Sequence, residues 1–313
     1  MTAKGSHFVK GVVMTCISAA LFGITPVLAS KTYEMGSNAL TLTFYRNLMA
    51  VPVLLVIMAV RKIPFRLTLR QFLLICAIGA GLRASTTFML YASYDYIGIG
   101  TATTLHFLYP LFTALFCLVL FRQRMGVGKC CALVLAAGGV GCFASFTGNR
   151  DLSGMLPGLI LAIASSITYS GYMTGMEHTA LRDMDATKVS CYMALSNAVA
   201  VMMINLPVQQ IHFALPPKAL LYTFIISICT SFFAFALLQL GIRELGASTA
   251  AIFCLLEPIT SVAAGWLLLN EAMTVKKAVG CLLVLGAVAA ALVAEKAANK
   301  KTPDGLTNQK PAG

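Results

Sequence analysis

Long apolar runs separated by short polar segments recur along the whole chain. We place them near residues 10–30, 38–60, 70–93, 98–121, 127–147, 154–176, 187–206, 218–241, 247–269 and 276–295. Most are about 20 residues long, the length that an α-helix needs to cross the hydrocarbon core of a bilayer. The runs are continuous and do not alternate with polar residues, which favours helices over the strands of a β-barrel. The pattern therefore predicts an all-α integral membrane protein with ten transmembrane helices.

The composition supports this prediction. Of 313 residues, 58% are hydrophobic and 11% are charged, against roughly 25% charged residues in an average soluble domain. No cleavable signal peptide is expected, because the first apolar run leads directly into others. The ten cysteines lie mostly inside apolar runs, and none shows zinc-ligand spacing. We therefore expect no disulfide framework, no metal site and no cofactor.

The distribution of Lys and Arg predicts the orientation. Sixteen of the 23 lie in the N-terminal segment, the loops after even-numbered spans and the C-terminal segment, whereas five lie in the opposite loops. This bias places both termini in the cytoplasm, most naturally of a bacterial cell with its cytoplasmic membrane. It also accounts for the net charge of +12 without a nucleic-acid partner. Residues 297–313 are polar with two prolines, and we expect a disordered cytoplasmic tail there.

An internal repeat divides the chain into residues 10–147 and 154–296. Shifting the sequence by 148 positions aligns 98–141 with 246–289 without a gap and gives 12 identities in 44 positions, including Pro110 on Pro258. Each half holds five spans, and an odd number forces the second half to enter the membrane from the opposite side. Inverted repeats of this kind are typical of secondary transporters, whose solute site lies near the midplane. A duplicated scaffold with no transport role is the alternative.

The repeated segments resemble a known family. The stretch "GTATTLHFLYPLFTALFCLVLFRQRMGVGKCCALVLAAGGV" and the later "GASTAAIFCLLEPITSVAAGWLLLNEAMTVKKAVGCLLVLGAV" are similar to the paired EamA signature of the drug/metabolite transporter superfamily. The second copy fits best, through Leu256-Glu257-Pro258 and the "LLLNE" that ends at Glu271. In the first copy Gln123 replaces the usual Glu. The resemblance implies ten helices, a central cavity between the halves, and movement of small metabolites, often amino acids.

Ionisable groups inside the spans are costly at membrane depth and are the first functional candidates. Arg83 lies roughly 20 Å from the cytoplasmic end of the third span, and its guanidinium could hold a substrate carboxylate or phosphate, or form a structural ion pair. Glu257 could couple transport to protons, or neutralise Arg83. Arg46 and His106 are further charge or coupling candidates, with structural roles as the alternative.

The matched prolines predict kinks near the solute site, because each removes a backbone hydrogen bond. Aromatic and amide side chains are candidates for binding the solute, with core packing as the alternative: Tyr109, Tyr169, Phe235 and Gln239. Phe232, Phe235 and Gln239 recur at i, i+3 and i+7, which places them on one face of the eighth span.

The leading functional hypothesis is secondary transport of a small metabolite by alternating access, driven by protons or by the solute gradient. No nucleotide-binding loop of the Walker type is present in the sequence. Arg83 favours an amino acid or related carboxylated solute, in the export direction; a nucleotide-sugar-like anion and a cationic drug are alternatives. The expected partners are this solute and the lipid bilayer, with a homodimer as an option through the small-residue spans at 127–147 and 276–295. The hypotheses outside transport are an intramembrane enzyme and a structural membrane protein.

Overall fold

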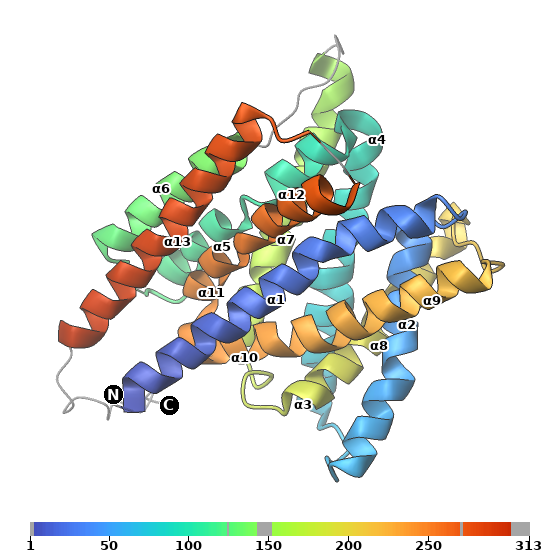
Figure 1. Cartoon of the computed structure of the whole chain (residues 1–313). Coiled ribbons are helices and arrows are strands. Elements are labelled where there is room, and N and C mark those ends of the chain that lie inside the picture. The colour runs from blue at the N-terminus through green and yellow to red at the C-terminus, as the bar shows by residue number, and fades with distance from the viewer. Residues whose placement is uncertain (1–2, 124, 143–151, 270–271, 302–313) are drawn as a thin grey trace.

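The computed structural model describes residues 3–123, 125–142, 152–269 and 272–301, and over these residues the regular structure is entirely helical (Figure 1). The first half contains α1 (Ala3–Tyr33), α2 (Ala39–Val60), α3 (Leu69–Ile75), η1 (Cys76–Arg83), α4 (Ala84–His106), α5 (Tyr109–Val119) and α6 (Val127–Gly141). The second contains α7 (Leu152–His178), α8 (Ala186–Val208), α9 (Pro217–Ile226), η2 (Ser227–Ala234), α10 (Phe235–Leu245), α11 (Ala247–Cys254), α12 (Leu256–Leu269) and α13 (Val275–Lys301).

These elements combine into membrane spans. Within the described residues, nine helical segments are long and apolar enough to cross a membrane, and a shorter apolar helix covers Val127–Gly141. That helix is the fifth predicted span, whose last residues, from 143 on, lie outside the described part of the chain. The prediction of an all-α membrane protein built from two inverted five-helix repeats is confirmed.

The third and eighth spans each contain a π-helical stretch, η1 and η2. Such wide turns shift the phase of the later side chains in the span, and they occur frequently at functional sites. Arg83 is the last residue of η1 and Phe235 is the first residue after η2. The regular 3.6-residue period therefore does not hold across either span.

The fourth and ninth spans are interrupted at equivalent places. Phe107 and Leu108 separate α4 from α5, and Leu255 separates α11 from α12. Pro110 and Pro258 lie in the first turn after each break, where a proline costs no intrahelical hydrogen bond. Each of these spans begins next to a glycine with almost the same backbone geometry, Gly98 at φ 76° and Gly246 at φ 81°.

The two halves pack against each other along several helix pairs: α1 with α12, α1 with α10, α4 with α7, α2 with α8, and α6 with α13. Figure 1 shows α6 and α13 side by side at one edge of the bundle. Small residues allow these close approaches: Gly128 faces Ala294, and Gly23 of α1 lies directly against Thr260 of α12. The end of the bundle where α1 begins and α13 ends is called the terminal end below, and the other the mouth end.

The C-terminal helix extends beyond the span predicted for it. α13 continues to Lys301 and so includes the first residues of the predicted tail. The rest of that tail, residues 302–313, lies outside the described residues, as does Glu271.

Candidate functional site

A cavity of about 1030 Å³ lies between the halves, lined mainly by α1, α4 and α12. Its wall reaches Tyr33, the last residue of α1, and the exposed Lys276 at the start of α13. At depth it reaches Arg83 and Tyr169, which lie in the middle of their spans. The cavity therefore opens at the mouth end and extends toward the centre of the bundle.

Seven of the residues selected from the sequence line this cavity: Arg46, Arg83, His106, Tyr109, Tyr169, Glu257 and Pro258. They come from five different spans, so the fold brings together residues that are far apart in the chain. Tyr109 and Glu257 occupy equivalent positions of the two repeats. The internal repeat thus contributes a hydroxyl from the first half and a carboxylate from the second half to the same cavity.

Arg83 is held in place by aromatic rings. Its guanidinium carbon lies 4.4 Å from the ring centroid of Phe235 and 5.3 Å from that of Tyr172. Its Nη1 donates a hydrogen bond of 3.4 Å to the hydroxyl of Tyr172. Cation–π contacts of this kind are worth about 0.5–2 kcal/mol. They fix the guanidinium while leaving donors free for a ligand.

Arg83 and Glu257 form no ion pair within the described residues, so the alternative that Glu257 neutralises Arg83 directly is not what the structure shows. Arg46 lines the same cavity as Glu257. The Nε of Arg46 is buried without a hydrogen-bond partner in the described part of the chain. The backbone of Arg46 is tied to η2, because the Ser227 hydroxyl donates to its carbonyl at 2.5 Å.

Aromatic rings form the deep wall of the cavity. The rings of Tyr109 and Tyr169 meet edge to face with centroids 4.7 Å apart, and His106 lies 5.3 Å from Tyr169. His106 Nδ1 is 3.0 Å from the hydroxyl of Ser165. The buried hydroxyl of Tyr109 has no partner in the described residues beyond the weak thiol of Cys254. This wall combines apolar faces with a few unused polar groups, as solute sites commonly do.

Three selected residues do not line the cavity. Phe235 is 2% exposed and acts behind Arg83. Gln239 is also buried, and its amide donates to the Leu181 carbonyl at 3.2 Å, away from the cavity. Phe235 and Gln239 lie four residues apart within α10 and so share one face of it, but neither lines the cavity.

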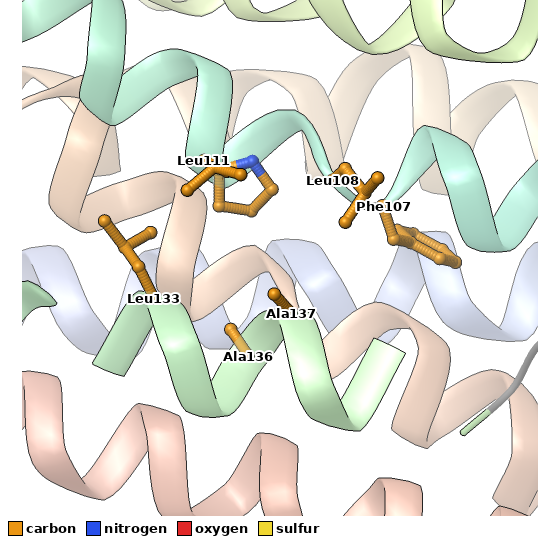
Figure 2. Close-up of a pocket in the computed structure, with 7 residues that line it drawn as sticks. Phe107, Leu108, Leu111, Leu133, Ala136 and Ala137 are labelled. Atoms are coloured by element: carbon orange, nitrogen blue, oxygen red, sulfur yellow. The ribbon is translucent and has the colours of Figure 1, made fainter. Parts of the chain in front are cut away.

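Pro110 is the third. It borders a separate small hollow between the break in the fourth span and α6 (Figure 2). The other residues around this hollow are apolar: Phe107, Leu108, Leu111, Leu133, Ala136 and Ala137. Its volume of about 10 Å³ is about one water-sized probe, so it is a packing defect next to the helix break and not a solute site.

Other cavity residues were not selected from the sequence. Tyr91 and Tyr94 are readily explained by depth as interfacial aromatics, yet both line the cavity, as does Tyr33. Lys276 and Lys277 lie at its mouth. Membrane depth alone does not separate a lipid-facing tyrosine from a cavity-facing one, because the two differ only in their angle around the helix.

The terminal end is closed by a polar cluster. Glu177, at the end of α7, accepts a hydrogen bond of 2.7 Å from the backbone amide of Ala247, the first residue of α11. Gln123 of the first half donates to Glu177 at 3.4 Å and lies 3.1 Å from His178. His178 stacks on Phe121 with a centroid separation of 3.5 Å. We refer to Phe121, Gln123, Glu177, His178 and Ala247 as the terminal latch.

Gln123 suits its place in the latch. A glutamate there, the residue type that the second repeat has at the equivalent Glu271, would put a second carboxylate beside Glu177, which like-charge repulsion disfavours. The neutral amide can donate to that carboxylate instead. The sequence shows Gln123 where the second repeat has Glu271. That Gln123 pairs with Glu177 becomes visible only in the structure.

The model of the EamA-like transporter family matches this chain twice, over residues 9–145 and 156–293. A protein of Bacillus subtilis described as an uncharacterized transporter, YcbK, is 25% identical over 284 residues that cover 87% of this chain and 89% of the relative. Another of Synechocystis, also described as an uncharacterized transporter, is 27% identical over 64% of this chain and 61% of its own length. A solved crystal structure superposes with a TM-score of 0.79 at 16% identity, covering 90% of this chain and 98% of that one, which shows a shared fold.

Proposed function

Because this chain belongs to the EamA-like transporter family, we propose that it moves a small carboxylated metabolite, an amino acid or a related acid, across the bacterial cytoplasmic membrane by alternating access. Residues 10–147 and 154–296 are the two halves that move, both termini lie in the cytoplasm, and the direction is export. The observation that carries the proposal is Arg83, a half-buried guanidinium fixed on Phe235 and Tyr172 at the deep end of a solute-sized cavity.

The difference between the two ends supports alternating access. Gly98 and Gly246 have the same backbone geometry in equivalent positions of the repeats. A side chain added at Gly246 would lie 3.0 Å from the carboxylate of Glu177, whereas nothing lies within 4 Å of one added at Gly98. Equivalent helix starts are thus covered at the terminal end and open at the mouth end. In an inverted repeat, exchange of these two arrangements opens the cavity to the other side.

Counterflow in proteoliposomes tests the proposal. Vesicles with purified protein are loaded with an unlabelled carboxylic acid or amino acid and diluted into the labelled solute. We expect saturable, transient accumulation with the wild type and none with Arg83→Ala. Arg70→Ala, which changes an exposed arginine outside the cavity, is the matched control and should transport normally. Equal counterflow by both variants would remove Arg83 from the solute site.

A further inference from the structure

The charged side chains around the cavity are unequal in sign. Among the described residues that line it, four are basic, Arg46, Arg83, Lys276 and Lys277, and one is acidic, Glu257. The lysines lie at the mouth, where Lys276 is exposed to solvent. The interior therefore holds two positive charges and one negative charge.

The second observation concerns the ion pairs of these interior charges. Within the described residues, no ion pair of 4 Å or less involves Arg46, Arg83 or Glu257. Arg83 rests on aromatic rings, which leave its charge in place. Arg46 and Glu257 line the same cavity, and the Nε of Arg46 is buried without a hydrogen-bond partner among the described residues. With the Glu257 carboxylate ionised, the three groups carry a net charge of one positive unit, and no ion pair within the described residues offsets it.

From this arrangement we infer that the solute carries one net negative charge, and that neutral zwitterionic amino acids are poor substrates. The inference rests on the proposed transport function and narrows its substrate class. During alternating access the solute must pass through a state closed at both ends, where an unbalanced charge at membrane depth is costly. A monoanion brings the interior to neutrality, whereas a zwitterion leaves the excess positive charge.

Two kinds of solute satisfy this requirement. A monocarboxylate without an amino group places its carboxylate on Arg83 and leaves Arg46 facing Glu257. An acidic amino acid, with two carboxylates and one ammonium group, can supply an opposite charge to each of Arg83, Arg46 and Glu257. Both kinds share one net negative charge, and the basic mouth at Lys276 and Lys277 would raise the local concentration of either.

The charge balance also sets a direction. A complete cycle moves one negative charge across the membrane, so the transmembrane potential acts on the transport. Cells keep their interior negative, and this potential drives an anion outward. Export follows from the sign of the transported charge without a coupling proton.

Proteoliposomes with imposed potentials test the inference. Labelled solutes of one carbon skeleton are compared: a 2-oxo acid, the corresponding neutral 2-amino acid and an acidic amino acid, with a K⁺ gradient and valinomycin setting the sign of the potential. We expect the monoanions to be taken up at least about tenfold faster than the zwitterion, and faster when the lumen is positive. Equal uptake of the zwitterion, or uptake indifferent to the potential, would overturn the inference while leaving transport intact. Absence of saturable flux for all three would overturn the proposed function itself.

A charge variant gives an independent test. Arg46→Gln lowers the net charge of the cavity interior from one positive unit to zero. The ratio of monoanion uptake to neutral amino acid uptake should therefore fall by about tenfold or more. Arg70→Gln, which removes a positive charge from an exposed position outside the cavity, should leave the preference unchanged. Thermal shifts with the same solutes report preference by binding alone, so a variant with slow flux remains informative. An Arg46→Gln protein that keeps the wild-type order of solutes would contradict the inference.

Discussion

The carboxylate of Glu177 accepts a hydrogen bond from the backbone amide of Ala247 at 2.7 Å, and this bond joins the end of α7 to the start of α11. The amide is one of the donors that a helix N-terminus leaves without an intrahelical partner. A carboxylate is a favourable acceptor there, since it also meets the positive end of the helix dipole. The bond therefore both caps a helix and closes the terminal end of the bundle.

Removal of this acceptor should loosen the terminal end. Glu177→Ala is expected to lower the free energy of unfolding by about 1.5–3 kcal/mol, the range for hydrogen bonds to charged groups. Glu34→Ala, which breaks an exposed pair with Lys31 at 3.9 Å, is the control and should cost about 1 kcal/mol or less. Thermal unfolding of the purified proteins measures both.

The same variant should change access as well as stability. A cysteine at the buried Ser248, next to Ala247, should react faster with a hydrophilic maleimide when Glu177 is alanine. An unchanged labelling rate would show that the terminal latch does not hold this end closed.

The equivalent glycines provide a matched pair. Gly246→Ala and Gly98→Ala both place a side chain at positive φ with an extended ψ, a conformation that costs roughly 1–3 kcal/mol for residues other than glycine. Only at Gly246 does the new carbon also approach Glu177, at 3.0 Å. We expect the greater loss of thermal stability for Gly246→Ala. Equal losses would indicate that strain alone accounts for both effects.

The aromatic support of Arg83 should affect affinity more than folding. Phe235→Leu keeps an apolar side chain but removes the ring 4.4 Å from the guanidinium carbon. If the free energy of solute binding weakens by about 0.5–2 kcal/mol, the range of a cation–π contact, KM should rise roughly two- to thirty-fold. Arg83→Lys keeps the charge and loses the planar fork, so its flux should fall by tenfold or more. Phe233→Leu, on the exposed side of the same span, is the control, and a KM shift as large as that of Phe235→Leu would refute this role.

Glu257, the one acidic side chain among the described residues that line the cavity, should set the preferred charge of the solute. Glu257→Gln leaves Arg46 and Arg83 with two uncompensated positive charges, so uptake of a dianion should rise relative to that of a monoanion. Competition between the two labelled solutes in proteoliposomes measures this ratio. If the variant abolishes a dependence of flux on a pH gradient and leaves the ratio unchanged, Glu257 is a proton-coupling group and not a fixed charge.

Much of the architecture could be predicted, because it depends on the lengths of the apolar segments and on the internal sequence repeat. The residues that the cavity brings together, Arg46, Arg83 and Glu257 among them, are those whose charge at membrane depth required an explanation. Residue type and depth are properties of the sequence, so this reasoning needs no coordinates.

The remaining features depend on helix phase and on contacts between distant segments. The π-helical stretches η1 and η2 rotate the side chains of the helices after them, which separates Gln239 from the cavity and places Phe235 behind Arg83. The terminal latch joins Gln123, Glu177 and Ala247, which no sequence spacing relates. Such partners become evident only when the helices are packed.

The central claim is that the cavity opens alternately at the two ends. Spin labels on Ile99 and Lys276, both of which line the mouth, and on the exposed Arg122 and Asp183 near the terminal latch would report each end in a cysteine-free background. Double electron–electron resonance is measured with and without solute. On solute binding, the distance between the labels on Ile99 and Lys276 should shorten, while the distance between the labels on Arg122 and Asp183 should lengthen. If both distances stayed unchanged, or changed in the same direction, the alternating-access account would be contradicted.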